Sequence, residues 1–343
     1  MMIKLSQDEA EIYDRQIRLW GVDAQQRIQN ASVLVAGVRA LSNELCKNLA
    51  LAGIGSITLL DDKVVGDDDL GVQFFLEEGS RGKNRAEAVA PAIRALNPRV
   101  KVEVDSSNVA DKPDTFFQAF DIVCMIHQDA ATLIRVNQAV RKADKRIPFY
   151  AADAFGWVGY IFCDLAKHEY IEEKEISSSQ SEETTTKRIQ HVEEYVTLEE
   201  SLQVDYSNIP NNKLKKKSAL GFVMHMILKH ELKHNRSITG VDAEDLVKNK
   251  SVALQEMGIS DGSFIDDELI SHVVSLFDSE LVPVTAIVGG VLAQEMIKVL
   301  SQKQLPIQNW FYYNGLSDSG MVHCVRNEEK PAVKEAPQDT IVL

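Results

Sequence analysis

One segment near the start of the chain, residues 32–61, restricts the possible folds more than any other part of the sequence. Ser32 to Gly37 is a short apolar run that ends in glycine, which is typical of a buried parallel strand. Leucine and alanine then recur at helical spacing up to Gly53, and Ser56 to Leu60 is a second apolar run closed by Asp61. Parallel neighbouring strands need such a crossover. The segment therefore predicts a βαβ unit and an α/β fold.

The alternation of strand and helix patterns continues to about residue 165. The expected elements are helices over 84–96 and 130–143 and strands over 100–104, 121–126, 147–152 and 157–163. This order is typical of a doubly wound, Rossmann-like sheet. Ligands on such sheets bind at the carboxyl ends of the strands.

An insertion in the second half of the chain interrupts this domain. We expect residues 1–171 and 275–326 to form the Rossmann-like domain, with residues 172–274 as a partly disordered helical insertion and 327–343 as a disordered tail. The insertion contains a polar, low-complexity run over 177–186, which we expect to be a mobile linker. Further elements are expected as helices over 218–234 and on towards 276, a long helix over 283–299, and strands over 309–313 and 321–325.

Composition excludes several classes of function. The chain has 37 Lys and Arg against 51 Asp and Glu, a net charge of −14, which disfavours nucleic-acid binding. No uninterrupted apolar run reaches the ~18 residues of a membrane span, and the first 14 residues lack a signal-peptide pattern. The four cysteines form no C-x-x-C pair, which favours a reducing compartment over a disulfide scaffold.

The loop after the first strand departs from a nucleotide-binding loop. A working loop has the pattern G-x-G-x-x-G, whose glycines let the backbone approach phosphate at a helix N-terminus. Residues 37–42 keep only the first glycine, Gly37, and place Arg39 where bare backbone is needed. Asp61 remains as an acid that could bind a ribose. The pattern favours a βαβ core without a working nucleotide site over a functional cofactor pocket.

Several segments together resemble the adenylation half of ubiquitin-like-protein activating enzymes, which has a ThiF-like fold. The opening segment Tyr13 to Gly21 resembles the N-terminal signature of that family. The matching segments then follow in the family's order: the βαβ unit with Asp61, Gln73-Phe74, Gly82 to Ala86, the helix over 284–295 and the strand over 311–313. The resemblance covers about residues 10–165 and 275–325. It implies that the Rossmann-like domain is an adenylation or pseudo-adenylation domain.

Four departures from the family pattern imply that the site of this chain is inactive. Active members have Asn-Arg before the Gln-Phe pair, where this chain has Gly71 and Val72. Arg85 replaces their lysine, and Gln128 stands at the aligned position of their Mg²⁺-binding aspartate. Adenylyl transfer depends on such positive groups and on metal to neutralise developing charge. The resemblance thus implies no bound cofactor or metal in this chain.

Arg15 is the candidate catalytic residue. In the family's heterodimers, the inactive subunit lends an arginine from this N-terminal segment to the ATP of its partner. A guanidinium presents a fixed fork of positive charge to phosphate oxygens. The alternative is that Arg15 is a surface helix residue paired with Asp14 or Glu11.

The resemblance implies a helper role in the SUMO-activating branch of the family. The larger partner subunit would bind ATP and Mg²⁺ and carry the catalytic cysteine, and SUMO would bind through the complex. Residues 172–272, where the family's cysteine-bearing domain is inserted, contain no cysteine. The four cysteines, in predicted helix or strand positions, are interpreted as small hydrophobes: Cys46, Cys124, Cys163 and Cys324. We expect neither nucleic acid nor membrane as partner, and expect the nucleus as location, with the cytoplasm as alternative.

Two further motifs have simpler interpretations. Residues 230–234 spell H-E-x-x-H, the zinc-binding pattern of metalloproteases. Lys233 within it and the lack of a clear third ligand favour a solvated helix face. The basic run Lys213 to Lys217 fits a solvated loop, a nuclear import signal or a patch for an acidic partner.

Three other functions remain open from the sequence. The chain could be a self-sufficient homodimeric adenylyltransferase of the same superfamily, which the altered phosphate-side residues disfavour. It could be a protein-docking scaffold without any link to modifiers. An NAD-dependent oxidoreductase is the least favoured, because the glycines of the loop and an evident hydride site are missing.

Overall fold

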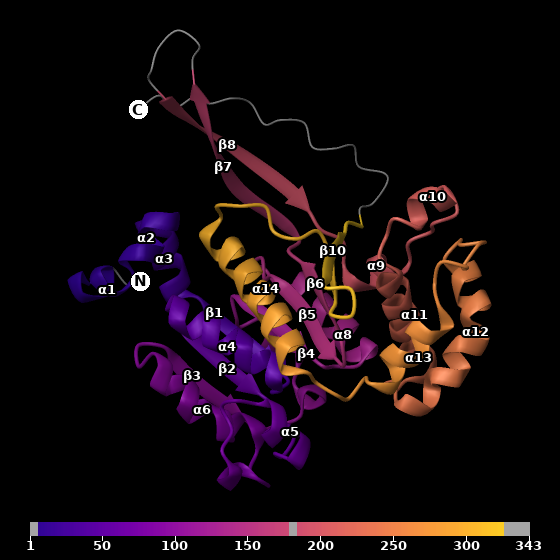
Figure 1. The fold of residues 1–343 in the computed structure, drawn as a ribbon. Helices are drawn as coiled ribbons and strands as arrows, with labels where there is room; N and C mark the ends of the chain where they lie inside the picture. The colour runs from indigo at the N-terminus through magenta and orange to yellow at the C-terminus, as the bar shows by residue number, and fades with distance from the viewer. Residues whose placement is uncertain (1–5, 178–183, 326–343) are drawn as a thin grey trace.

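A computed structural model describes residues 6–177 and 184–325 of the chain (Figure 1). Its centre is an eight-stranded sheet in the order β10-β9-β6-β5-β4-β1-β2-β3. The strands are β1 Ser32–Ala36, β2 Ser56–Leu60, β3 Lys101–Asp105, β4 Ile122–Ile126, β5 Phe149–Phe155, β6 Val158–Asp164, β9 Trp310–Asn314 and β10 Ser319–His323. β1 to β5 are parallel, whereas β6, β9 and β10 are joined by antiparallel pairings. The predicted doubly wound α/β fold is confirmed.

Helices cover both faces of the sheet, because successive strand residues point to opposite sides. In β1, Val33 and Val35 belong to one core cluster and Leu34 and Ala36 to the other. The first cluster includes residues of α3 Val22–Asn30, α4 Ala40–Ala52, α6 Arg85–Leu96 and α14 Val282–Ser301. The second includes residues of α7 Asp114–Phe117, α8 Ala130–Arg141, α9 Leu198–Leu202, α10 Asn211–Leu214, α11 Ala219–His234, α12 Ala243–Glu256 and α13 Asp267–Ser275.

Helix α14 closes the fold by packing on α4. Among the described residues it is the one helix long and apolar enough to cross a membrane by length and composition. Its place is against α4 and the sheet (Figure 1). A Cβ at Gly289 would lie 2.7 Å from Glu44 Cβ, so the two helices approach closely only because this position is glycine.

The N-terminal helices lie at the C-terminal end of α4. They are α1 Gln7–Ile12 and α2 Asp14–Trp20, followed by α3. Tyr13 packs on Gly53, which ends α4 with φ +79°, and the Tyr13 hydroxyl accepts a hydrogen bond from Asn97 Nδ2 at 2.9 Å. The carboxyl end of β1 lies at the other end of α4.

A protruding hairpin flanks the run that the sequence predicts to be a mobile linker. β7 Lys167–Ser177 and β8 Thr184–Glu194 pair antiparallel along their whole lengths and extend away from the sheet (Figure 1). The expected insertion boundary at residue 172 therefore falls within β7, and both ends of the polar run 177–186 belong to strands. The pairing of backbone groups and the strand preference of threonine stabilise these strands without an apolar pattern. Residues 178–183 and the tail 327–343 lie outside the described residues.

Short helices complete the chain. They are α5 Asp67–Val72 and the 3₁₀ turns η1 Glu78–Ser80, η2 Val109–Asp111 and η3 Gly240–Asp242. The expected helix over 218–234 is α11, and α12 and α13 follow it towards residue 276. The insertion thus contributes one helical layer of the core rather than a separate body.

Candidate functional site

A cavity of about 950 Å³ lies at the carboxyl ends of the central strands. It opens between β1 and β4, where the order of the sheet reverses, which is the usual ligand position in this fold. Gly37, Asp61 and His127, which follow β1, β2 and β4, line it together with Glu231 and Glu280 from the second half of the chain. The candidate site is therefore built from both halves of the sequence.

The N-terminus of α4 is closed by the carboxylate of Glu280. Its two oxygens accept hydrogen bonds from the backbone N–H groups of Ala40 and Leu41, at 3.0 and 3.1 Å. Glu280 also lies 3.4 Å from Arg39 Nε. A nucleotide-binding βαβ unit places a phosphate at this helix end, because its free N–H groups and dipole attract an anion. Here a side chain of the protein itself takes that position.

Arg39 reinforces the closure. Its Nη2 donates a hydrogen bond to the backbone oxygen of Asp278 at 2.8 Å. Burial alone would lower the pKa of Arg39, but Glu280, Asp153 and Asp278 outweigh that effect and raise it. The segment before α14 is thus held over the N-terminus of α4 by charge and by backbone contacts.

A second carboxylate closes the N-terminus of α8 in the same cavity. Glu231 accepts hydrogen bonds from the backbone N–H groups of Ala130 and Ile238, at 3.0 and 2.9 Å. Burial raises the pKa of Glu231 to about 7 despite these two hydrogen bonds. The helices that follow β1 and β4 therefore both have carboxylates where an anionic ligand would otherwise bind.

Gly37 and Asp61 hold the loop after β1. Gly37 has φ +94°, and a Cβ there would lie 2.0 Å from the backbone oxygen of Ile126, so only glycine fits. Asp61 accepts hydrogen bonds from the backbone N–H groups of Val38 and Lys63, at 2.5 and 2.7 Å. Burial raises the pKa of Asp61 against these contacts. Both Asp61 oxygens are thus engaged with this chain's own backbone.

Arg85 and Val72 lie beside the cavity without forming a phosphate site. Arg85 Nε donates to Asp69 Oδ2 at 2.9 Å, so its charge is already neutralised. Asp69 also accepts from Gln73 Nε2 at 2.7 Å. Gly71 and Val72 offer no charge at the end of α5. The four positions that depart from the family pattern thus all line one cavity. Arg85 is paired with a carboxylate of this chain, and Gly71 and Val72 have no polar side chain.

Gln128 and His127 occupy the end of β4. Gln128 Nε2 donates to the backbone oxygen of Ile126 at 3.0 Å. His127 Nδ1 lies 2.8 Å from Asp153 Oδ2, and its Nε2 lies 3.5 Å from Asp278 Oδ1. Burial alone would lower the pKa of His127, but the two carboxylates raise it to about 9. A cationic imidazole therefore adjoins the position of the family's magnesium ligand, and it would repel a metal ion.

The overall charge of the cavity opposes a triphosphate. Among its lining residues, carboxyl side chains outnumber lysine and arginine nine to three. Two of the basic residues, Arg39 and Arg85, are paired with buried carboxylates. A polyanion entering this space would meet like charges at short range. The residues present do not fit ATP.

Arg15 lies on a different part of the molecule. It is exposed on α2, and among the described residues no contact partner is found for its guanidinium. Arg18, rather than Arg15, pairs with Asp14, at 2.9 Å. The N-terminal helices pack at the far end of α4, whose 13 residues span about 20 Å. Arg15 is therefore remote from the cavity of its own chain.

The H-E-x-x-H segment is not the solvated helix face that the sequence predicts. His230 and Glu231 are buried, and only the residues that follow them are exposed. The reason is that α11 lies between α8 and α12, so this part of its surface is covered on two sides. Since Glu231 binds backbone N–H groups of Ala130 and Ile238, it is not placed as the base of a peptidase.

The lysines of the basic run are mostly exposed, whereas most of the cysteines are buried. Lys213, Lys215 and Lys216 are exposed at α10 and the turn after it. Three cysteines are buried in α4, β4 and β6, and burial raises the pKa of Cys46 to about 12. The fourth, Cys324, is exposed just after β10 rather than within a strand. The described cysteines do not include one in the insertion.

No sequence pattern predicted the two glutamates that close the cavity. Glu280 lies 240 residues from Ala40, and Glu231 lies 101 residues from Ala130. No local pattern connects residues at such separations. The available signal was the loss of glycines at 39 and 42, which indicates that the helix N-terminus no longer binds an external anion.

Comparisons of the sequence and of the fold with known proteins point to one family. The model of the ThiF family matches residues 13–334. Curated relatives include "SUMO-activating enzyme subunit 1" of Xenopus tropicalis, 38% identical over 94% of this chain and 97% of the relative. The proteins of the same name from Bos taurus and Homo sapiens are each 36% identical over 94% of this chain and 96% of theirs. A solved structure titled "Crystal Structure of SeMet PaaA" shares the fold, with a TM-score of 0.54 and 13% identity, over 93% of this chain and 74% of that one.

Replacing Glu280 by alanine tests the closure of α4. The change removes the acceptor of two N–H groups and leaves Arg39 buried without this partner, so we expect the free energy of unfolding to fall by roughly 2 kcal/mol in urea denaturation. We also expect inorganic phosphate to stabilise Glu280→Ala more than the wild type, because the helix end becomes accessible to an anion.

The matched control is Glu256→Ala, an exposed glutamate at the end of α12. Its stability should stay within about 0.5 kcal/mol of the wild type. If Glu280→Ala is as stable as this control and no more sensitive to phosphate than the wild type, then Glu280 does not occupy an anion site.

Proposed function

This chain belongs to the ThiF family, and on that premise we propose that it is the smaller, non-catalytic subunit of a heterodimeric SUMO-activating enzyme. The observation that carries the proposal is the match of 94% of the chain to proteins named SUMO-activating enzyme subunit 1, at 36–38% identity. The complex would adenylate the C-terminus of SUMO with ATP, release pyrophosphate, and form a thioester on a cysteine of the larger subunit.

The cavity supports different roles for the two subunits. Its helix ends are closed by Glu280 and Glu231, and its charge is unfavourable for a triphosphate. We therefore assign ATP and Mg²⁺ to the larger subunit, which would also carry the cysteine. A homodimeric adenylyltransferase would need to bind ATP in this same cavity, so the closed helix ends disfavour that alternative.

Arg15 is the residue that we assign to the reaction. Its exposed guanidinium has no partner among the described residues and cannot reach the cavity of its own chain. When donated across an interface, it would neutralise charge on the phosphates of the partner's ATP during adenylyl transfer. This contribution requires that α2 lies at the contact with the larger subunit.

The surface around Arg15 suits such a contact. Leu19 is 76% exposed and lies one helical turn from Arg15 on α2, so the two share a face. Ile12, Val22 and Leu51, which flank α2 or lie at the end of α4, are also exposed apolar residues. An apolar surface with an arginine is typical of the centre of a stable interface. We further propose a nuclear location, supported by the exposed lysines of the run 213–217.

Arg15→Ala is expected to lower ATP–pyrophosphate exchange by the reconstituted heterodimer on the order of 100-fold or more. The reason is the loss of a charge-assisted contact that strengthens in the transition state. Arg18→Ala, three residues away on the same helix, serves as the control and should leave the rate near that of the wild type. Exchange at the wild-type rate by an intact Arg15→Ala heterodimer would remove this residue from the reaction.

Leu19→Asp is expected to reduce recovery of the larger subunit by at least about tenfold in co-purification. A carboxylate at the centre of the interface would be buried without a partner. Val252→Asp is the matched control, because Val252 is 55% exposed on α12, on the opposite side of the molecule from α2 (Figure 1). Equal recovery with both variants would show that α2 does not contact the partner.

A further inference from the structure

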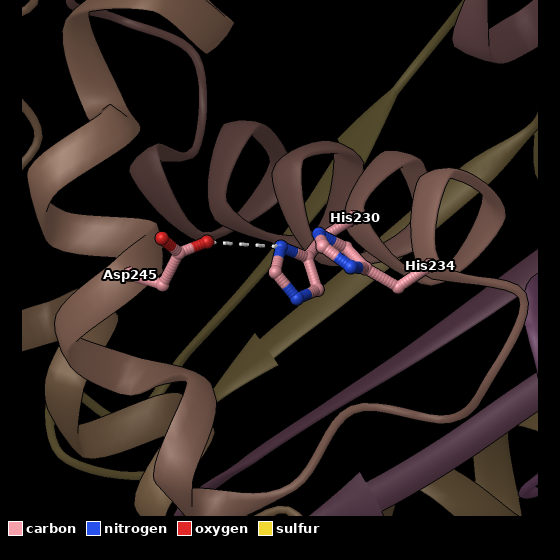
Figure 2. A group of neighbouring side chains, drawn as sticks. All are labelled: His230, His234 and Asp245. Carbon is pink, nitrogen blue, oxygen red and sulfur yellow. Dashed lines mark ion pairs between the residues drawn. The ribbon is translucent and has the colours of Figure 1, made fainter.

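Helices α11 and α12 bring two imidazoles and a carboxylate together outside the cavity (Figure 2). His230 and His234 lie one turn apart on α11, with their ring centroids 4.2 Å apart. Asp245 faces them from α12, and its Oδ2 lies 3.8 Å from His230 Nδ1. One ligand atom from each of the three residues lies within 4.8 Å of the other two.

The groups that surround His230 are those expected around a metal ligand. The His230 side chain is 8% exposed, and its Nε2 is buried without a hydrogen-bond partner among the described residues. Asp242 Oδ1 lies 3.6 Å from that Nε2, on the other side of the ring from Asp245. If Nδ1 binds a metal, Nε2 carries the proton and can donate it to Asp242, which is the arrangement that orients metal-bound histidines.

Asp242 is itself held in place. Arg236 donates to both of its oxygens, at 2.5 and 2.8 Å, and the Thr239 backbone N–H donates to Oδ2 at 2.8 Å. These contacts fix the carboxylate beside His230 independently of any ion. The side chain that would support the first ligand is thus positioned before an ion arrives.

From this arrangement we propose that His230, His234 and Asp245 bind a divalent transition-metal ion of the zinc type. Imidazole and carboxylate ligands suit such ions, with bonds of about 2.0–2.2 Å. Two ligand atoms of one ion therefore lie at most about 4.4 Å apart, and the present separations, all within 4.8 Å, come below that limit with small side-chain rotations. His234 and Asp245 are exposed, which leaves them free to rotate and leaves an open position for water.

The ion fastens α11 to α12 and has no catalytic role in peptide hydrolysis. Glu231, which would be the general base in a metalloprotease, turns to the other side of α11 and binds Ala130 and Ile238. The site thus uses the two histidines of the H-E-x-x-H segment but takes its third ligand from α12. Its effect is expected on the stability of the helical layer that covers one face of the sheet.

The test is zinc binding by the full chain after removal of metal with a chelator. We expect one equivalent of Zn²⁺ in equilibrium dialysis, a rise in the melting temperature with Zn²⁺, and a visible absorption band with Co²⁺ as a probe. His234→Ala removes an exposed ligand, so the fold should persist while the affinity for Zn²⁺ falls at least about tenfold. Asp245→Asn should weaken binding as well.

His191→Ala is the control, because His191 lies on the hairpin and pairs with Glu172. This variant should bind Zn²⁺ as the wild type does. No stoichiometric Zn²⁺ on the wild-type chain would overturn the proposal, and so would binding that persists unchanged in His234→Ala. These readouts do not involve the larger subunit, so they are independent of the proposed function.

Discussion

The contact between the carboxylate of Glu280 and the N-terminus of α4 is the interaction on which the closed state of the cavity depends. It satisfies two backbone N–H groups and pairs with Arg39, at the position where this fold otherwise binds a phosphate. The fold therefore keeps a stable βαβ unit without needing a ligand at its helix end. Because Glu280 comes from the segment before α14, the same contact also ties that segment to the start of α4, the helix that follows β1.

The cavity and Arg15 lie at opposite ends of α4. The cavity lies at the switch point, the usual ligand position in this fold, but it is lined by carboxylates, a paired Arg85 and a cationic His127. The arginine without a partner among the described residues, Arg15, lies at the other end of α4. This arrangement supports the proposal that the chain assists chemistry in a partner subunit rather than binding ATP in its own cavity.

The sequence predicted those parts of the structure that local patterns encode. β1, α4 and β2 follow from apolar periodicity and from Gly37 and Gly53. The closure by Glu280 could not be predicted, since its partners lie 240 residues away and the contact exists only in the folded chain. The β7–β8 hairpin was missed because its strands are polar. The burial of His230 depends on α12, which no pattern within α11 reveals.

Equilibrium binding of magnesium ATP to the isolated full chain tests the central claim most directly. The closed helix ends and the acidic lining predict no saturable binding up to concentrations on the order of millimolar. The nucleotide should likewise leave the melting temperature of the chain unchanged. Stoichiometric binding with a dissociation constant in the micromolar range would contradict the account, since it would require the nucleotide to displace Glu280 from the N-terminus of α4.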